Sequence, residues 1–179
     1  PGGMSAIIGI DSSSVKEVCE ETGTYLSNIN TSNQIIIAGK KENLVNAMDL
    51  ASRLGAKKAI PLPVAGAFHS ALMSSAQQEL NSVIDDANFE DAVVPIVANT
   101  SAEAITDKGS LRDELKTQLQ NCVLWSDSIN YMIEEKVETF YEIGPGSVLS
   151  GMLKRIDSNL NVKNIGNYNQ VLDYVEARS

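Results

Sequence analysis

The spacing of apolar and polar residues over positions 1–63 predicts four strands and two helices. Helices are predicted between Asp11 and Gly23 and over residues 41–54, where apolar residues recur every three to four positions. Short apolar runs bounded by turn residues predict strands over residues 4–10, 25–30, 34–38 and 59–64. The resulting order, βαββαβ, is the split arrangement called ferredoxin-like, which does not assign a function by itself.

In residues 64–179 predicted helices alternate with predicted strands. The helices cover residues 70–87, 110–120, 126–136, 147–157 and 169–177, and the strands cover residues 93–98, 139–143 and 162–165. This alternation is typical of a parallel sheet with helices on both faces, but such a sheet usually has about five or six strands. We therefore expect an α/β chain with two parts. Residues 1–63 form a small ferredoxin-like subdomain, and residues 64–179 form the C-terminal part of a larger α/β domain that is truncated here.

The charge and cysteine content exclude several classes of function. A net charge of −9 disfavours nucleic-acid binding, because neutralising phosphates requires a basic face. Two distant cysteines do not make a disulfide framework and indicate a cytoplasmic protein. No apolar run reaches the roughly 18 residues of a membrane span, so no membrane partner is expected. Three basic pairs could form a local anion patch, although solvated ends of helices and strands are the commoner explanation: Lys40–Lys41, Lys57–Lys58 and Lys154–Arg155.

Common cofactor and nucleophile motifs are absent from the sequence. It contains neither a phosphate-binding loop nor a dinucleotide-binding turn, and one histidine with two cysteines does not supply a zinc site. No cofactor and no metal are therefore expected. The G-x-S-x-G elbow of serine hydrolases is also missing. Residues 144–148, Gly-Pro-Gly-Ser-Val, come near it, but Ser147 is better explained as the N-cap of the following helix.

His69, the only histidine, is the strongest candidate for chemistry. It follows an extended run and precedes a helix, the position at which α/β folds place reactive groups. Histidine is also the side chain best suited to proton transfer near neutral pH. Spacing alone leaves the alternative of a structural histidine open, and slightly favours it.

The residues around His69 resemble a known family. Residues 66–73, Gly-Ala-Phe-His-Ser-Ala-Leu-Met, are similar to the histidine motif of malonyl-CoA:acyl-carrier-protein transacylases and of acyltransferase domains of fatty-acid and polyketide synthases. Other segments resemble that family in the same order: residues 3–9, 28–39, 118–119 with 123–125, and 141–149. The resemblance covers nearly the whole chain. Ser32, Asn33 and Cys122 replace family proline and glycine residues, and none of them is a catalytic group.

The resemblance implies a ping-pong transfer of malonyl from malonyl-CoA to the thiol of acyl carrier protein, within an α/β-hydrolase-like domain. His69 would be the catalytic base, the main-chain carbonyl of Gln118 would orient it, and Phe68 would line the acyl pocket. The family's serine elbow, malonyl-binding arginine and oxyanion loop lie upstream of the segments matched here. We therefore expect these 179 residues to be inactive on their own.

Two alternatives remain at this point. Residues 1–63 alone would fit a non-enzymatic ligand-binding or interaction module of ferredoxin-like type. Within the enzymes, a fragment of a polyketide synthase acyltransferase domain competes with a free-standing transacylase. The ordered matches in residues 64–149 favour an enzyme, and the absence of an interdomain linker after the last predicted helix favours the free-standing form.

Overall fold

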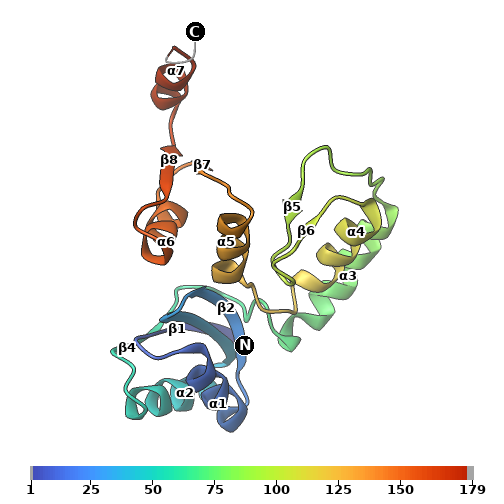
Figure 1. Cartoon of the computed structure of the whole chain (residues 1–179). Helices are drawn as coiled ribbons and strands as arrows, with labels where there is room; N and C mark the ends of the chain where they lie inside the picture. The colour runs from blue at the N-terminus through green and yellow to red at the C-terminus, as the bar shows by residue number, and fades with distance from the viewer. Residues whose placement is uncertain (1, 177–179) are drawn as a thin grey trace. The chain divides into compact units, whose positions relative to one another are not determined.

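A four-stranded antiparallel sheet forms the beginning of the chain (Figure 1). The structure, a computed structural model, describes residues 2–176 and divides into two compact units, one ending at Ser128 and the other beginning at Ile129. The sheet lies in the first unit, and its strands run in the order β2-β3-β1-β4. Their bounds are β1 Gly2–Ile8, β2 Tyr25–Thr31, β3 Gln34–Lys40 and β4 Lys58–Pro61, each close to its predicted range.

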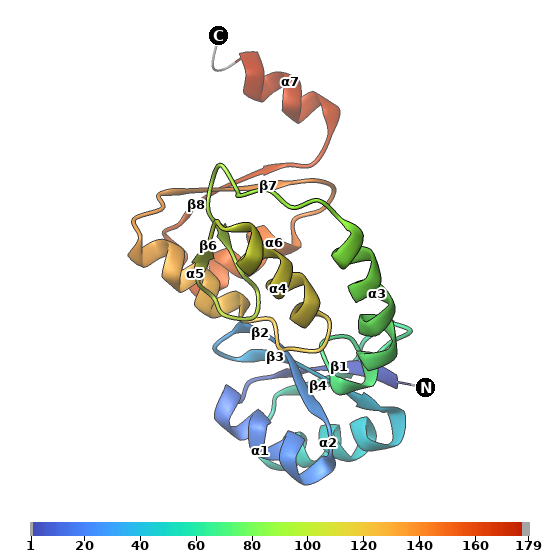
Figure 2. The same ribbon diagram turned by 90° about the vertical axis from the view of Figure 1, so that its right-hand side faces the viewer.

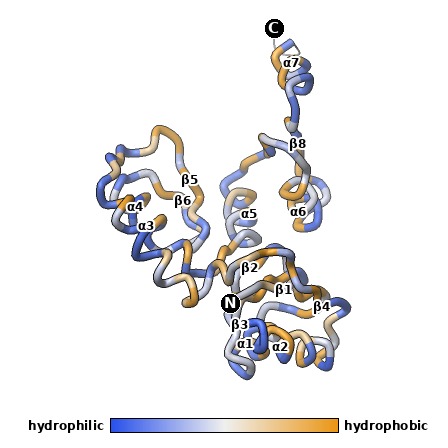
Figure 3. Tube along the Cα trace, turned by 180° about the vertical axis from the view of Figure 1, so that it is seen from behind, coloured by the Kyte–Doolittle hydropathy of each residue, from blue (hydrophilic) through white to orange (hydrophobic). Residues whose placement is uncertain are grey.

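Helices α1 (Ser12–Thr22) and α2 (Lys41–Arg53) cover one face of this sheet (Figure 2). The Asp11 carboxylate accepts a hydrogen bond of 2.8 Å from the N–H of Ser14, which caps α1, and Gly23 ends the helix in the left-handed region at φ 64°. Apolar residues dominate much of the sheet (Figure 3). The core between helices and sheet contains the buried residues Ile7, Val15, Val18, Ile35, Ile37, Leu44, Ala47 and Ala51.

The other face of the sheet packs against the segment that leads to His69. Met4, Ala6, Ile36 and Ala38 point to this face and form a second buried cluster with Ala67. Alternate residues of a strand point to opposite faces, so β1 and β3 contribute to both clusters. The chain between β4 and the next helix is therefore anchored on the sheet two residues before the histidine.

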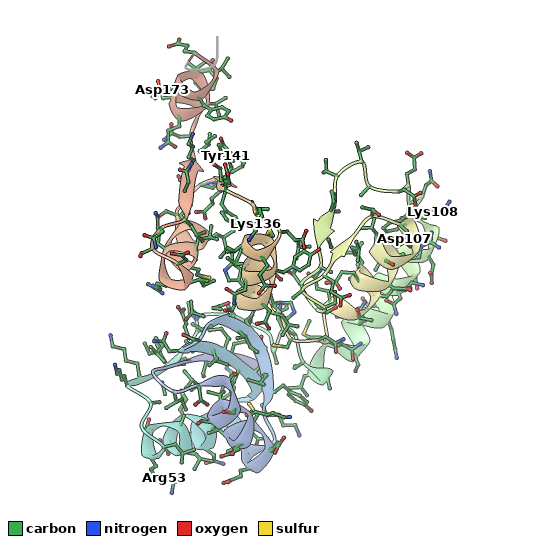
Figure 4. The ribbon with its side chains drawn as sticks, viewed as in Figure 1. Arg53, Asp107, Lys108, Lys136, Tyr141 and Asp173 are labelled. Carbon is green, nitrogen blue, oxygen red and sulfur yellow. The ribbon has the colours of Figure 1, made fainter. Side chains whose placement is uncertain are left out.

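The rest of the first unit is built around a pair of packed helices, α3 (Ser74–Asp86) and α4 (Lys108–Gln118). An ion pair between Lys116 and Asp85 links them, and the Asp107 side chain caps α4 by accepting from the N–H of Ser110 at 2.9 Å (Figure 4). The elements in chain order are η1 Ala71–Met73, α3 Ser74–Asp86, β5 Ile96–Val97, β6 Ala104–Ile105, α4 Lys108–Gln118 and α5 Trp125–Glu134, the last of which continues beyond Ser128.

The predicted strand over residues 93–98 is wrong in length and in direction of pairing. Only Ile96 and Val97 are in a strand, and they pair antiparallel with Ala104–Ile105, a strand that the sequence did not predict. Ala102, at φ 58°, lies in the turn between them, and its N–H donates to the carbonyl of Ala98 at 3.0 Å. Polar turn residues follow the apolar run at once, so the chain reverses into a short hairpin.

The second unit contains a parallel strand pair, β7 (Thr139–Ile143) and β8 (Asn161–Ile165), connected through α6 (Val148–Ile156). The prediction of parallel pairing is confirmed for these two strands. Helix α7 (Tyr168–Glu176) follows; residue 177, at the end of its predicted range, lies outside the described residues. No described helix has both the length and the apolar character needed to cross a bilayer.

Glu142 joins the end of β7 to the beginning of α6. Its carboxylate accepts hydrogen bonds from the N–H of Leu149 at 3.0 Å, the N–H of Ser150 at 2.8 Å and the hydroxyl of Ser150 at 2.5 Å. Ser147 does occupy the N-cap position, but its side chain makes no capping hydrogen bond. Two of the free N–H groups at the beginning of α6, those of Leu149 and Ser150, are therefore satisfied by a carboxylate from the preceding strand, and a negative charge is favourable at that end of a helix.

Replacing Glu142 with glutamine is expected to reduce stability at neutral pH but not in acid. The hydrogen bonds from Ser150, followed by those from main-chain N–H groups, hold the pKa of Glu142 below its ordinary value of 4.5. A lowered folded-state pKa contributes stability above pH 4.5 and loses it as the pH falls through the folded value. Urea midpoints of the two proteins should therefore converge below pH 4.5. Glu138→Gln, which removes an exposed charge from the same unit, should show no such convergence.

Candidate functional site

The His69 ring is held by the end of helix α4. Its Nδ1 lies 2.8 Å from the main-chain oxygen of Gln118, the last residue of that helix. The last carbonyls of a helix lack intrahelical partners, so this oxygen is available as an acceptor. A carbonyl oxygen only accepts, so Nδ1 carries the proton and Nε2 of the neutral ring is free to take one up. This is the arrangement required of a general base.

The main chain at His69 has an uncommon conformation that three contacts support. Its φ is 58°, in the left-handed region, which costs a non-glycine residue about 1–2 kcal/mol. The N–H of His69 donates to the carbonyl of Leu119 at 3.0 Å, and the hydroxyl of Ser27 donates to the carbonyl of Phe68 at 3.1 Å. With the ring contact to Gln118, these bonds fix both the backbone and the side chain. Such strain is characteristic of functional positions.

The segment after α4, a turn followed by an isolated bridge at Val123, brings Gln118 to His69, across 49 positions of sequence. The N–H of Val123 donates to the carbonyl of Ser27 at 2.8 Å, and its carbonyl accepts from the N–H of Ile29 at 2.9 Å. These bonds attach the segment to β2, beside which it passes in Figure 2. Because Ser27 also contacts the Phe68 carbonyl, one strand positions both partners of the histidine contact.

A pocket of about 270 Å³ opens beside the His69 ring. Its polar lining comes from His69, Asn99 and Gln118, and its apolar lining from Leu80, Leu115, Leu119 and Val123. A neighbouring pocket of about 330 Å³ shares Asn99, Leu115 and Gln118 with it. The histidine therefore faces a concave, mostly apolar site of the kind that binds small ligands.

Phe68 stands apart from this pocket. The residue is 39% exposed, and it is not among the residues that line the space beside His69. Its ring lies over Gly66, where an added Cβ would come within 3.2 Å of two ring atoms. The structure thus brings His69 and Gln118 together and leaves Phe68 on the exposed side of the same segment. Its role in an acyl pocket stays a prediction.

Neither cysteine is suited to act as a nucleophile, and the described residues offer no metal site. Burial raises the pKa of the Cys122 thiol to about 11, and it raises that of Cys19 as well. Both thiols are therefore protonated near neutral pH and are poor nucleophiles. Within residues 2–176 no cluster of three or more histidine, cysteine or acidic side chains could hold a metal ion.

Asn99 and Ser27 are site residues that the sequence analysis missed. Asn99 lines both pockets, and its side chain donates to the side-chain oxygen of Gln118. Ser27 is fully buried and bonded to the Phe68 carbonyl. An asparagine directly after the apolar run at 93–98 was a signal that could have been used, because polar residues at strand ends often reach a site. Nothing in the sequence marks Ser27.

Two sequence relatives show what the chain resembles. No family model matches it. It is 43% identical over 164 residues to the malonyl CoA-acyl carrier protein transacylase of Bacillus subtilis, covering 89% of this chain and 52% of that protein. It is 41% identical over 163 residues to the transacylase of the same name from Escherichia coli, covering 89% of this chain and 53% of that protein. The chain thus spans about half the length of the curated relatives it matches.

Solved structures agree with these matches. An acyl carrier protein S-malonyltransferase from Vibrio cholerae superposes with a TM-score of 0.92 at 34% identity, over 97% of this chain and 58% of that one. A malonyl-transacylase solved in complex with a type II PKS acyl-carrier protein superposes with a TM-score of 0.93 at 33% identity, over 98% of this chain and 58% of that one. Sequence and structure together show that this chain belongs to the malonyl CoA-acyl carrier protein transacylase family.

Proposed function

We propose that this chain provides the histidine half of a malonyl-CoA:acyl-carrier-protein transacylase of fatty-acid synthesis. The observation that carries the proposal is the 2.8 Å contact between His69 Nδ1 and the Gln118 carbonyl, which leaves Nε2 unprotonated beside a pocket. The names of the matched relatives supply the substrates, malonyl-CoA and acyl carrier protein. The matches extend over both the sheet and the helical part, which disfavours a stand-alone binding module.

The proposed reaction has two acyl transfers, each assisted by His69. A serine from outside these 179 residues attacks the malonyl thioester, and Nε2 of His69 takes the serine proton. The protonated ring then gives that proton to the departing CoA thiolate, leaving a malonyl-serine ester. The carrier-protein thiol reverses these steps. The carbonyl of Gln118 belongs to the last turn of α4, and the negative end of a helix stabilises the positive charge the ring carries between transfers.

We further propose that residues 1–63 are a ferredoxin-like subdomain and that residues 64–179 belong to the large α/β domain. The element order and the sheet order β2-β3-β1-β4 support the first part. The parallel pairing of β7 with β8 supports the second. We expect the protein to act in the cytoplasm on malonyl-CoA and on the thiol of acyl carrier protein.

Two preparations test this function. The 179-residue chain alone is expected to show no transfer of malonyl from malonyl-CoA to acyl carrier protein, because the nucleophile is missing. A chimera that joins this chain to the unmatched half of the Bacillus subtilis relative is expected to transfer malonyl at an enzyme-like rate. A folded but inactive chimera, judged by circular dichroism, would count against the proposed function. Enzyme-like activity of the isolated chain would refute the requirement for an external serine.

Replacing Phe68 with serine in the chimera is expected to raise the use of methylmalonyl-CoA relative to malonyl-CoA. A phenyl ring beside the acyl group would crowd an additional methyl, and one methyl-sized difference changes kcat/KM by about tenfold. The measurement is the ratio of kcat/KM for the two substrates. Phe68→Tyr keeps the ring and should keep the ratio. An unchanged ratio in Phe68→Ser would show that Phe68 does not line the acyl pocket.

A further inference from the structure

Glu114 anchors the loop after β5 to helix α4, one turn before Gln118. Its carboxylate accepts hydrogen bonds from the N–H of Asn99 at 3.0 Å, the N–H of Thr100 at 3.2 Å and the hydroxyl of Thr100 at 2.5 Å. Residues four apart lie on the same face of a helix, so Glu114 and Gln118 face this loop together. The carboxylate therefore fixes the main chain at Asn99 relative to the last turn of α4.

Asn99 connects this anchored loop to Gln118 by a hydrogen bond between their side chains. Its side-chain Nδ2 donates to the side-chain oxygen of Gln118, and its carbonyl accepts from the N–H of Leu124 at 2.8 Å. Asn99 is thus held by α4 at its N–H, by the segment after α4 at its carbonyl, and by Gln118 at its side chain. These contacts add to the bonds that the end of α4 makes with the turn after it, where the N–H of Asn121 donates to the Gln118 carbonyl at 3.4 Å and the Asn121 side chain donates to the carbonyl of Thr117 at 2.8 Å.

We propose that Asn99 and Glu114 are positioning residues that fix the Gln118 carbonyl and, through it, the tautomer and direction of the His69 ring. Neither residue contacts His69 by hydrogen bond in the described structure. They act by keeping the carbonyl where Nδ1 can donate to it at 2.8 Å. If the last turn of α4 moves, Nδ1 loses its acceptor and the alternative tautomer, with the proton on Nε2, becomes populated. In that tautomer Nε2 already carries a proton, so it cannot take one from a nucleophile on its side of the ring.

The test uses the 179-residue chain and the fact that His69 is its only histidine. Nitrogen NMR of the labelled chain reports which ring nitrogen carries the proton, with no assignment of other histidines needed. In the unmodified chain the Nδ1–H tautomer is expected to predominate. In Asn99→Leu the ratio of Nδ1–H to Nε2–H is expected to fall about fivefold, the effect of weakening one neutral hydrogen bond. Gln118→Leu, which keeps its main-chain carbonyl, should have the same effect.

A double variant and two kinds of control distinguish a positioning role from a general loss of folded structure. Asn99→Leu combined with Gln118→Leu should give no further fall, because both changes remove one shared bond. Glu114→Ala should lower the ratio, whereas Glu114→Gln keeps an oxygen for the two main-chain N–H groups and should retain it. Gln120→Leu alters a neighbouring side chain that is no described partner of His69, Asn99 or Glu114, and should leave the ratio unchanged.

An unchanged tautomer ratio in folded Asn99→Leu and Gln118→Leu would overturn the inference. Loss of the folded amide spectrum in both would also count against it, since a positioning role predicts a local change at the ring. The inference rests on the proposed role of His69 as the base, but the readout is independent of activity. An inactive chimera together with a shifted tautomer would therefore refute the proposed function and leave the positioning role standing.

Discussion

Replacing His69 with alanine in the chimera with the Bacillus subtilis relative is expected to lower kcat/KM for malonyl transfer by about 10³- to 10⁴-fold. Proton transfer by a positioned side chain contributes about 10²–10⁴-fold, and this reaction uses the histidine in both transfers. No other described side chain shares its position: the pocket beside it is otherwise lined by amides and aliphatic groups. The measurement is the steady-state rate of malonyl transfer to acyl carrier protein.

The matched control for His69→Ala is Glu17→Ala, which removes an exposed side chain from α1 and should leave the rate unchanged. The His69→Ala variant should also fail to accumulate a malonyl-serine ester after rapid mixing with malonyl-CoA, since the first transfer already needs the base. If His69→Ala kept its rate within tenfold of the parent, the histidine would be structural, the alternative that its position in the sequence left open.

Replacing Ile37 with alanine is expected to destabilise the 179-residue chain by about 2–5 kcal/mol. Ile37 lies in the middle of β3, is fully buried, and packs in the cluster between the sheet and its two helices. Removing its side-chain carbons leaves a cavity that strands on both sides prevent from closing, because β3 pairs with β1 and with β2. Urea denaturation followed by circular dichroism measures the change in the free energy of unfolding.

Val45→Ala provides the comparison for this prediction. Val45 is on α2, is 53% exposed, and lies next to the buried Leu44, so the pair distinguishes burial from residue type. Surface changes of this kind usually alter stability by no more than about 0.5 kcal/mol. A loss below about 1 kcal/mol for Ile37→Ala would show that the sheet region does not have the close-packed core described here.

Local sequence signals were enough for most of the elements in the first 63 residues. The apolar runs that became β1 and β3 and the caps at Asp11 and Gly23 depend only on neighbouring residues, and each was predicted within a few positions. The same holds for the helices of residues 64–179, whose apolar spacing is regular. The hairpin of β5 and β6 was not predicted, because each strand has only two residues, too few for a hydrophobic period to be recognised.

The sequence alone was enough to assign the family, most of the segments that become helices and strands, and the histidine that carries the proposed chemistry. It could not determine what holds that histidine. Gln118 was proposed only by resemblance, and the bonds of Asn99 and Glu114 were not foreseen. His69 and Gln118 are 49 positions apart in the sequence, and they come into contact because the segment at Val123 pairs with β2. A short motif specifies local conformation, whereas such a contact depends on hydrogen bonds between distant segments that exist only in the folded chain.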